Sequence, residues 1–153
     1  MKANQKIETT LIGRLIENTF SGPAWHGPSL LETIQEIPAT AALRKSPATH
    51  RIIELVLHMA VWRNFVTRRL LGDNAFEVSD QENFPQSEDW GLAIEIIKKS
   101  QTDLLDALKK FPIERLAETV PSRGYDFYTM LHGIIQHDTY HIGQVVLLKK
   151  QFE

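Results

Sequence analysis

The sequence predicts an all-α protein, built as a four-helix bundle with a short extra helix. Apolar residues recur at three- and four-residue spacing in four long stretches, and Gly or Pro follows three of them. No segment shows the sustained alternation of apolar and polar residues that is typical of half-buried strands. Four helices of about 15–22 residues favour a bundle. We expect residues 1–153 to form one domain.

The first long helix is predicted over residues 4–18 and ends before the breaker cluster at residues 21–23. Its inward stripe is predicted to consist of Ile7, Leu11, Leu15 and Ile16. An irregular loop follows. Ser29 and Glu32 then have the spacing of a capping box, so a short helix is expected to begin there and to end before Pro38.

The second long helix is predicted from about His50 to Leu71, and Gly72 suits the left-handed residue after a helix end. Its broad apolar face contains Ile52, Leu55, Val56, Met59, Trp62, Phe65, Val66 and Leu70. Residues 73–85 are polar and have no period, so they are predicted to form a loop.

The third helix is predicted to begin after Ser87, its cap, with Glu88 and Asp89 in its first turn, and to end at Phe111 before Pro112. A connection with at most one helical turn follows. Asp126 is predicted to cap the fourth helix, which continues to about Lys150. Its inward residues are predicted to be Met130, Ile134, Val145 and Leu148. Gly133 and Gly143 interrupt this helix, and such glycines often mark the close approach of another helix.

Composition narrows the class of function. The formal net charge is −2 and no long Lys/Arg track is present, which argues against a nucleic-acid partner. The absence of cysteine excludes disulfides, thiolate ligands and a cysteine nucleophile. No stretch has the roughly 18 apolar residues of a membrane span, and the N-terminal residues lack an apolar signal core. A cytoplasmic protein with no membrane partner is expected.

Three histidines form the clearest functional pattern. His137 and His141 lie four residues apart, so they share one helix face. His58 lies on the apolar second helix, where a buried imidazole needs a partner. If these helices pack together, the three imidazoles can hold one divalent metal ion and leave a position open. Imidazole serves zinc and nickel alike.

Other kinds of metal site fit the sequence less well. The HDxxH spacing has Asp138 where the zincin motif needs Glu, and Glu54 and Glu95 lack the paired Glu-x-x-His motifs of di-iron bundles. His132 is out of phase with the pair. His26 is the other candidate for a fourth ligand, which would make the site structural. Taken alone, a pair of half-buried, hydrogen-bonded histidines needs no metal.

The motifs resemble those of a known family. His137, His141, Gly143 and Gln144 form HxxxHxGQ in the last helix. His58 and Trp62 form HxxxW in the second, and GPAWHGPSL follows the first. Together they resemble the DinB-like superfamily over most of the chain. The resemblance implies a four-helix bundle with a long crossover connection, and a divalent metal held by His58, His137 and His141.

The resemblance also implies a class of chemistry. Relatives include thiol-dependent S-transferases, a mycothiol-dependent isomerase and metal-dependent hydrolases. We therefore expect an enzyme that activates a small thiol, with hydrolysis of a small substrate or a non-catalytic metal-binding bundle as alternatives. Several relatives form dimers, and bundles bury faces readily, so a homodimer is expected.

The catalytic residues are less well defined by the sequence. No general base is obvious, although Asp138 or Gln144 could support the histidines. Arg63, Arg68 and Arg123 are candidates for holding a substrate carboxylate, and each can equally be a solvated surface charge. Trp25 and His26 would reach a pocket only if their loop folds over the bundle.

Overall fold

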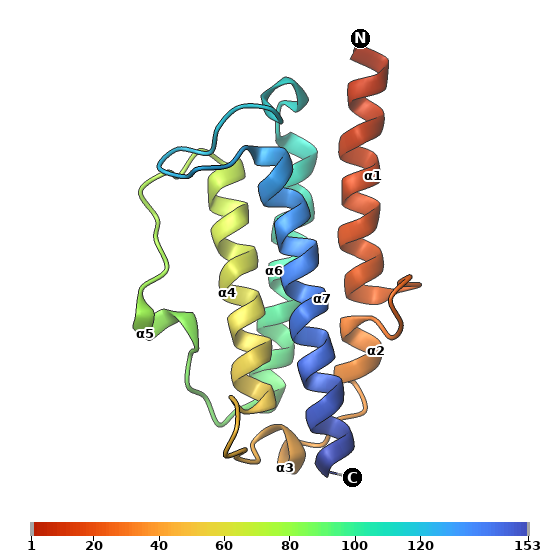
Figure 1. Cartoon of the computed structure of the whole chain (residues 1–153), viewed down its shortest axis with the longest axis vertical. Coiled ribbons are helices and arrows are strands. Elements are labelled where there is room, and N and C mark those ends of the chain that lie inside the picture. Colours follow the sequence, from red (N-terminus) through yellow and green to blue (C-terminus); the bar gives the residue numbers. More distant parts are fainter. Residues whose placement is uncertain (1, 153) are drawn as a thin grey trace.

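Four long helices lie side by side and form a bundle in the computed structural model of the chain (Figure 1). The structure describes the backbone of residues 2–152 and the side chains of residues 8–152. The long helices are α1 (Lys2–Ser21), α4 (Ile52–Leu70), α6 (Trp90–Lys110) and α7 (Phe127–Phe152). The described residues include no β-strand, only two isolated bridges. The predicted all-α bundle is confirmed.

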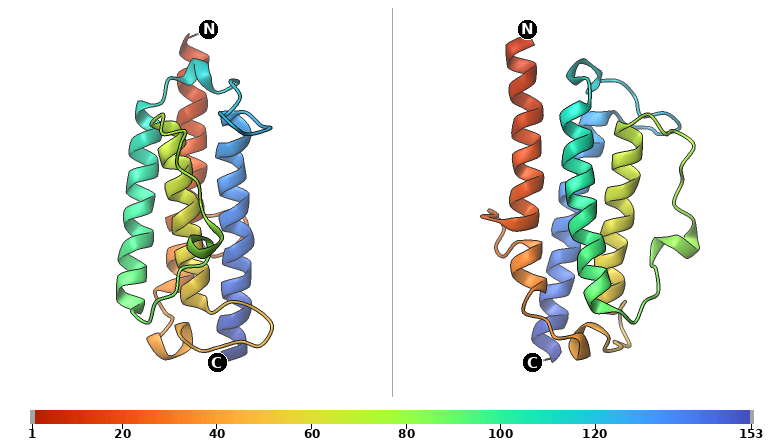
Figure 2. Two further views of the ribbon diagram at one scale, coloured as in Figure 1. Left: turned by 90° about the vertical axis from the view of Figure 1, so that its left-hand side faces the viewer. Right: turned by 180° about the vertical axis from the view of Figure 1, so that it is seen from behind.

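One long connection crosses the bundle from end to end. Helices α4 and α6 both run upward in Figure 1, whereas α1 and α7 run downward. The chain between α4 and α6 therefore returns along the outside of α4, as Figure 2 shows from two further sides. This is the long crossover that the family resemblance implies. The short helix α5 (Asp80–Asn83) lies in it, in a stretch that was predicted to be loop.

Three more short elements lie in the other connections. They are α2 (Leu30–Ile34), α3 (Ala39–Ala42) and the 3₁₀ turn η1 (Ile113–Arg115). Helix α2 is the predicted short helix, and η1 is the single turn expected before the last helix. Helices α3 and α5 were not predicted, because four residues are too few to show a helical period.

Hydrogen bonds at the helix ends confirm two of the predicted caps. The Ser29 N–H donates to Glu32 Oε2 at 2.8 Å, and the Glu32 N–H donates to Ser29 Oγ at 3.4 Å, which completes the capping box of α2. At α7 the Thr129 N–H donates to Asp126 Oδ1 at 2.7 Å. These bonds satisfy backbone donors that have no partner within the helix.

A third cap differs from the prediction. Asp89, not Ser87, caps α6: its Oδ1 accepts a hydrogen bond from the Leu92 N–H at 2.9 Å. Ser87 instead accepts from the Asp89 N–H at 3.1 Å, one step before the cap. At the end of α4, Gly72 has a φ of +88°, the left-handed conformation that its position predicts.

Two buried apolar clusters hold the helices together. One lies around Ile53, Ile97 and Val145 and includes α2. The other lies around Phe65, Leu104 and Leu131 and includes α1. Each cluster draws residues from α4, α6 and α7, which explains why these three helices form the centre of the bundle. The inward residues predicted for α7 are all buried.

The buried face of α1 matches the predicted one only in part. Ile16 is buried as predicted, and Ile12 is buried as well, whereas Leu11 and Leu15 are 41% and 46% exposed. The side chain of Ile7 lies outside the described residues. Helical spacing does not choose between two overlapping stripes that are both apolar, and contact with α6 decides in favour of Ile12 and Ile16.

The glycines of α7 do not mark close helix contacts. A Cβ placed on Gly133 or on Gly143 would meet no neighbouring heavy atom within 4 Å. The expectation that another helix packs tightly against them is therefore wrong. Both positions face open space.

A buried ion pair joins the central helices. Arg63 of α4 and Asp138 of α7 approach to 2.6 Å between Nη2 and Oδ2, and both side chains are almost completely buried. The Arg63 Nη1–H also donates to Gln101 Oε1 of α6. Arg63 is therefore neither a surface charge nor available to a substrate, contrary to both predictions. Its guanidinium satisfies a carboxylate that would otherwise be buried unpaired.

Replacing Arg63 should be strongly destabilising. We expect Arg63→Met to lower the free energy of unfolding by about 3–5 kcal/mol, because it leaves the Asp138 charge buried without a partner. Urea denaturation measures this change. Lys99→Met is the matched control, since it breaks the exposed Lys99–Asp103 pair and should cost less than about 1 kcal/mol. Similar losses for both variants would contradict the assignment.

Candidate metal site

Three imidazoles converge between α4 and α7. One possible ligand atom from each of His58, His137 and His141 lies within 4.8 Å of the others. The Nε2 atoms of His58 and His137 are 3.0 Å apart. The ring centroid of His141 lies 4.6 Å from that of His58 and 4.5 Å from that of His137. Two nitrogens on one tetrahedral zinc ion would be about 3.3 Å apart, so the cluster has the size of a mononuclear site.

The elements that carry the histidines explain this convergence. His137 and His141 stand one helical turn apart on α7, so their side chains lie above one another on one face. His58 projects from the middle of α4, which packs along α7. The ion pair between Arg63 and Asp138 joins the same two helices next to His137.

Hydrogen bonds donated by Nδ1–H orient two of the rings. His58 Nδ1–H donates to the Asn83 carbonyl oxygen at 2.6 Å, and His141 Nδ1–H donates to Gln144 Oε1 at 2.6 Å. Both acceptors are oxygens, so they assign the proton of each neutral ring to Nδ1. The lone pair of Nε2 is then free on both rings. Metal-binding histidines are usually oriented in this way.

The third ring faces a carboxylate. His137 Nδ1 lies 3.5 Å from Asp138 Oδ1, and both atoms are buried without a hydrogen-bond partner among the described residues. Nε2 of His137 points at Nε2 of His58 across 3.0 Å, and the tautomer of His137 decides which ring donates in this contact. A divalent ion that accepted the Nε2 lone pair of each ring would replace this contact, and three imidazoles are a donor set that fits such an ion.

Burial keeps two of the three imidazoles neutral. It lowers the pKa of His58 from its ordinary value of 6.5 to about 4, and the Asn83 carbonyl only partly offsets this effect. Burial also lowers the pKa of His141, against the opposing hydrogen bond to Gln144. Neutral imidazole is the form that binds metals. At neutral pH these two rings therefore do not need to lose a proton first.

The crossover connection closes one side of the cluster. The Phe84 ring stacks between His50 and His58, at centroid distances of 3.6 Å and 4.1 Å. The Trp62 Nε1–H donates to Asn83 Oδ1 at 2.9 Å, which fixes the end of α5 against α4. This role of residues 83–84 was not predicted. Phe84 stands in a polar stretch without helical period, so the sequence does not indicate which helix its side chain contacts.

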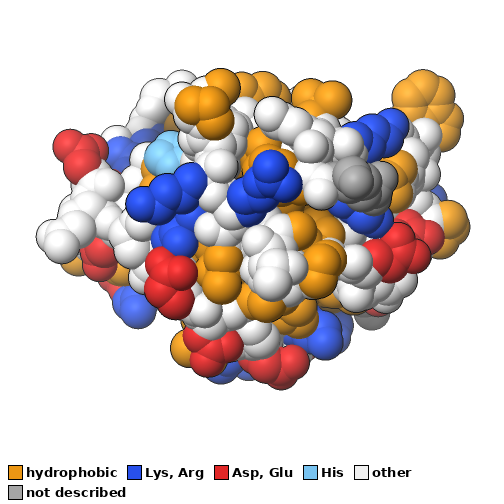
Figure 3. Space-filling model, turned by 90° about the horizontal axis from the view of Figure 1, so that it is seen from below, with side chains coloured by type: hydrophobic (Ala, Val, Ile, Leu, Met, Phe, Trp, Pro, Cys, Tyr) orange, Lys and Arg blue, Asp and Glu red, His pale blue; other side chains and the backbone are white. Residues whose placement is uncertain are grey.

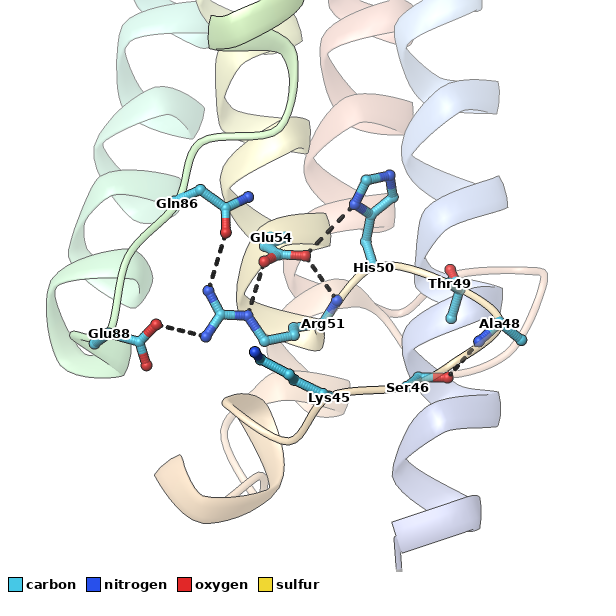
Figure 4. Close-up of a pocket in the computed structure, with 9 residues that line it drawn as sticks. All are labelled: Lys45, Ser46, Ala48, Thr49, His50, Arg51, Glu54, Gln86 and Glu88. Atoms are coloured by element: carbon cyan, nitrogen blue, oxygen red, sulfur yellow. Dashed lines mark hydrogen bonds and ion pairs between the residues drawn. The ribbon is translucent and has the colours of Figure 1, made fainter.

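Two cavities flank the cluster. An apolar cavity of about 260 Å³ lies between α4 and α7, and His137 forms part of its wall. Its apolar lining includes Trp62, Phe65, Val66, Met130 and Ile134. A larger polar cavity of about 560 Å³ lies beyond His50, near the start of α4 (Figure 4).

Charged groups in the polar cavity neutralise one another. The Arg51 guanidinium donates to Glu54 at 2.7 Å and to Glu88 at 2.6 Å, and to Gln86 at 3.3 Å (Figure 4). His50 Nδ1 lies 3.4 Å from the Glu54 carboxylate. Arg51 is therefore committed to holding the crossover connection against α4.

The remaining candidate residues lie away from the cluster. His132 is outside the cluster, as its phase on the helix predicts, and its Nδ1–H donates to the Tyr128 carbonyl oxygen of the same helix at 2.9 Å. Trp25 and His26 are exposed, and their loop projects on the side of the bundle opposite α5 (Figure 1). The loop does not fold over the cluster.

The other two arginines are both paired. Arg68 and Asp73 approach to 2.9 Å at the surface. Arg123 pairs with Glu77 and lies over the Phe65 ring. Each guanidinium is thus engaged by a carboxylate of the chain itself, so neither is left free to hold a substrate carboxylate.

The lowered pKa of His58 predicts how stability depends on pH. In the metal-free protein, the unfolded chain binds a proton on this ring near pH 6.5 and the folded chain only near pH 4. The stabilisation of the folded state by the neutral His58 ring is therefore complete above pH 6.5 and is lost as pH falls toward 4. Replacing His58 with Leu should flatten the fall in unfolding free energy over this window, measured with urea at each pH. His26→Ala is the control, and equal slopes for His58→Leu and the parent protein would contradict the prediction.

Comparison with known proteins agrees with the motifs. No curated protein and no solved structure shows a significant match to the chain. The family model described as the DinB superfamily matches residues 25–145, which is most of the chain and includes all three clustered histidines. The chain therefore belongs to the DinB superfamily.

Proposed function

We propose that the protein is a divalent-metal-dependent enzyme acting on small molecules, with a small thiol as the nucleophile. The observation that carries this proposal is the convergence of three imidazoles, each with its Nδ1 near an oxygen atom. His58, His137 and His141 would hold the ion, which is zinc or nickel. When bound, such an ion supplies Lewis acidity that favours the anionic form of a thiol or of water.

The surrounding residues supply orientation and access. Asn83 and Gln144 hold two of the rings through their Nδ1 atoms, and Asp138 faces the third. His58 and His141 are buried, whereas 25% of the His137 side chain is accessible and borders the apolar cavity. A substrate can therefore approach the imidazoles from that side, where bulk water is partly excluded.

Access on one side favours an enzyme over a structural site. A structural site is closed by a fourth protein ligand. Among the described residues, no other His, Asp or Glu joins the three histidines in the cluster. His26, the candidate fourth ligand, lies on the exposed loop after α1. An open fourth position is thus part of the proposal.

Metal content tests the ligand set. We expect about one divalent ion per chain after dialysis against zinc or nickel, because three imidazoles suffice for a catalytic site. Replacing His58, His137 or His141 with Ala should sharply reduce occupancy, measured by elemental analysis. His132→Ala, on the same helix as two of the ligands, should keep it. Stoichiometric metal in the triple-Ala variant would show that the ligands lie elsewhere.

Thiol conjugation tests the reaction. Metal-loaded protein is incubated with several low-molecular-weight thiols and an aromatic electrophile, and products are followed by mass spectrometry. The thiol sulfur should replace the leaving group of the electrophile, and the rate should fall to background in His137→Ala. Equal rates in both proteins, or none above background, would remove the transferase. Metal-dependent hydrolysis of a small ester would then support the hydrolase alternative.

The surface is consistent with a small-molecule substrate. Both positive and negative side chains are present at the end of the bundle seen in Figure 3. Among the described residues, no helix combines the length and apolar character needed to cross a bilayer. A cytoplasmic location stays a prediction, which cell fractionation can test.

A homodimer also stays a prediction. Its support in the described residues is the pair of exposed leucines on α1, Leu11 and Leu15. Exposed apolar side chains on one helix face often mark association. Light scattering should give twice the monomer mass at high micromolar concentration, and Leu11→Lys with Leu15→Lys should reduce it to the monomer mass. A monomer in the parent protein would exclude the dimer.

A further inference from the structure

The apolar cavity beside His137 lies where the nonreacting part of a substrate would have to sit. His137 is the accessible member of the histidine cluster, and it forms part of the cavity wall. On the opposite side, Phe84 stacks on His58 and closes the approach. A molecule that reaches the imidazoles from the open side therefore enters this cavity.

The lining defines what kind of group fits. Trp62, Phe65 and Met130 provide apolar walls, and no charged side chain lines the cavity among the described residues. The Trp62 Nε1–H is already donated to Asn83, so the indole presents its apolar surface. The polar groups of the lining are confined to Tyr125, Thr129 and His137. A carboxylate placed against the apolar walls would lose its hydration and find no cationic side chain, which is unfavourable.

The volume limits the size of that group. The cavity measures about 260 Å³. An enclosed apolar cavity of about 150 Å³ holds one benzene molecule. A single substituted aromatic ring, or a short branched aliphatic chain, therefore fits within it.

Gly133 keeps this space open. It lines the cavity, and a Cβ on it would meet no neighbouring heavy atom within 4 Å. Its conformation is helical, so the helix does not require glycine there. A larger side chain at this position would project into the cavity and reduce its volume.

We propose that this cavity is the specificity pocket for an uncharged apolar group the size of one aromatic ring, carried by the substrate. The proposal rests on the proposed function only for the statement that the occupant is a substrate. Binding to the cavity itself can be measured without metal, so the two can fail separately.

Fluorine NMR with para-fluorotoluene as the probe tests the pocket in metal-free and metal-loaded protein. We expect Gly133→Leu to weaken binding at least about tenfold in both forms, because the added side chain occupies the cavity. Gly143→Leu is the matched control. It has the same change in helix propensity on the same helix, at an exposed position that also faces open space. The affinity of Gly143→Leu for para-fluorotoluene should differ from that of the parent protein by less than about twofold.

A second measurement needs no substitution. Of the three methionines, Met130 lines the cavity and Met59 is buried outside its lining. With isotope-labelled methionine methyl groups, the probe should shift the Met130 signal and leave that of Met59 unchanged. This result stands even if Gly133→Leu fails to fold.

Three outcomes would overturn the proposal. The first is equal binding by Gly133→Leu and the parent protein. The second is a Met130 signal that does not respond at saturating probe. The third is tighter binding of para-fluorobenzoate than of para-fluorotoluene to the metal-free protein, which would show that the pocket selects an anion. Retained metal in Gly133→Leu, measured by elemental analysis, separates loss of the pocket from loss of the metal site.

Discussion

The ion pair between Arg63 of α4 and Asp138 of α7 fixes how these two helices lie along each other, and the histidine cluster depends on that register. Apolar contacts alone tolerate sliding, because they are not directional. A buried guanidinium and carboxylate tolerate it poorly, since each would be left unpaired. Asp138 immediately follows His137 in sequence, so the contact that aligns the helices also positions one member of the cluster. Gln101 extends the same constraint to α6.

Much of this architecture is predictable from the sequence, and the limits have a physical pattern. Helical period located the four long helices, and the i, i+4 spacing of His137 and His141 located one side of the cluster. These are local properties of one helix. The pairing of Arg63 with Asp138 depends on how α4 and α7 dock, so a charge within an apolar stretch was compatible with a solvated surface position. For the same reason, the burial of Ile12 rather than Leu11 required knowledge of what packs against α1.

The crossover connection does more than join two helices. Asn83 accepts hydrogen bonds from His58 through its carbonyl and from Trp62 through its side chain, and Phe84 stacks on the His58 ring. Arg51 holds the following residues against the start of α4. The connection therefore orients one imidazole and blocks one approach to it. Access is left on the side of His137, which is why the apolar cavity, and not the larger polar one, adjoins the accessible ring.

Burial also determines which kind of cation the three imidazoles can accept. A proton and a divalent ion are the two kinds of cation that imidazole nitrogens bind. Burial lowers the pKa of His58 to about 4 and lowers that of His141 as well, so neither of these rings gains a second proton near neutral pH. A divalent ion can accept a lone pair from each ring at once, and its charge does not depend on pH in this range. The desolvation that opposes protonation thus leaves the nitrogen lone pairs available to a metal.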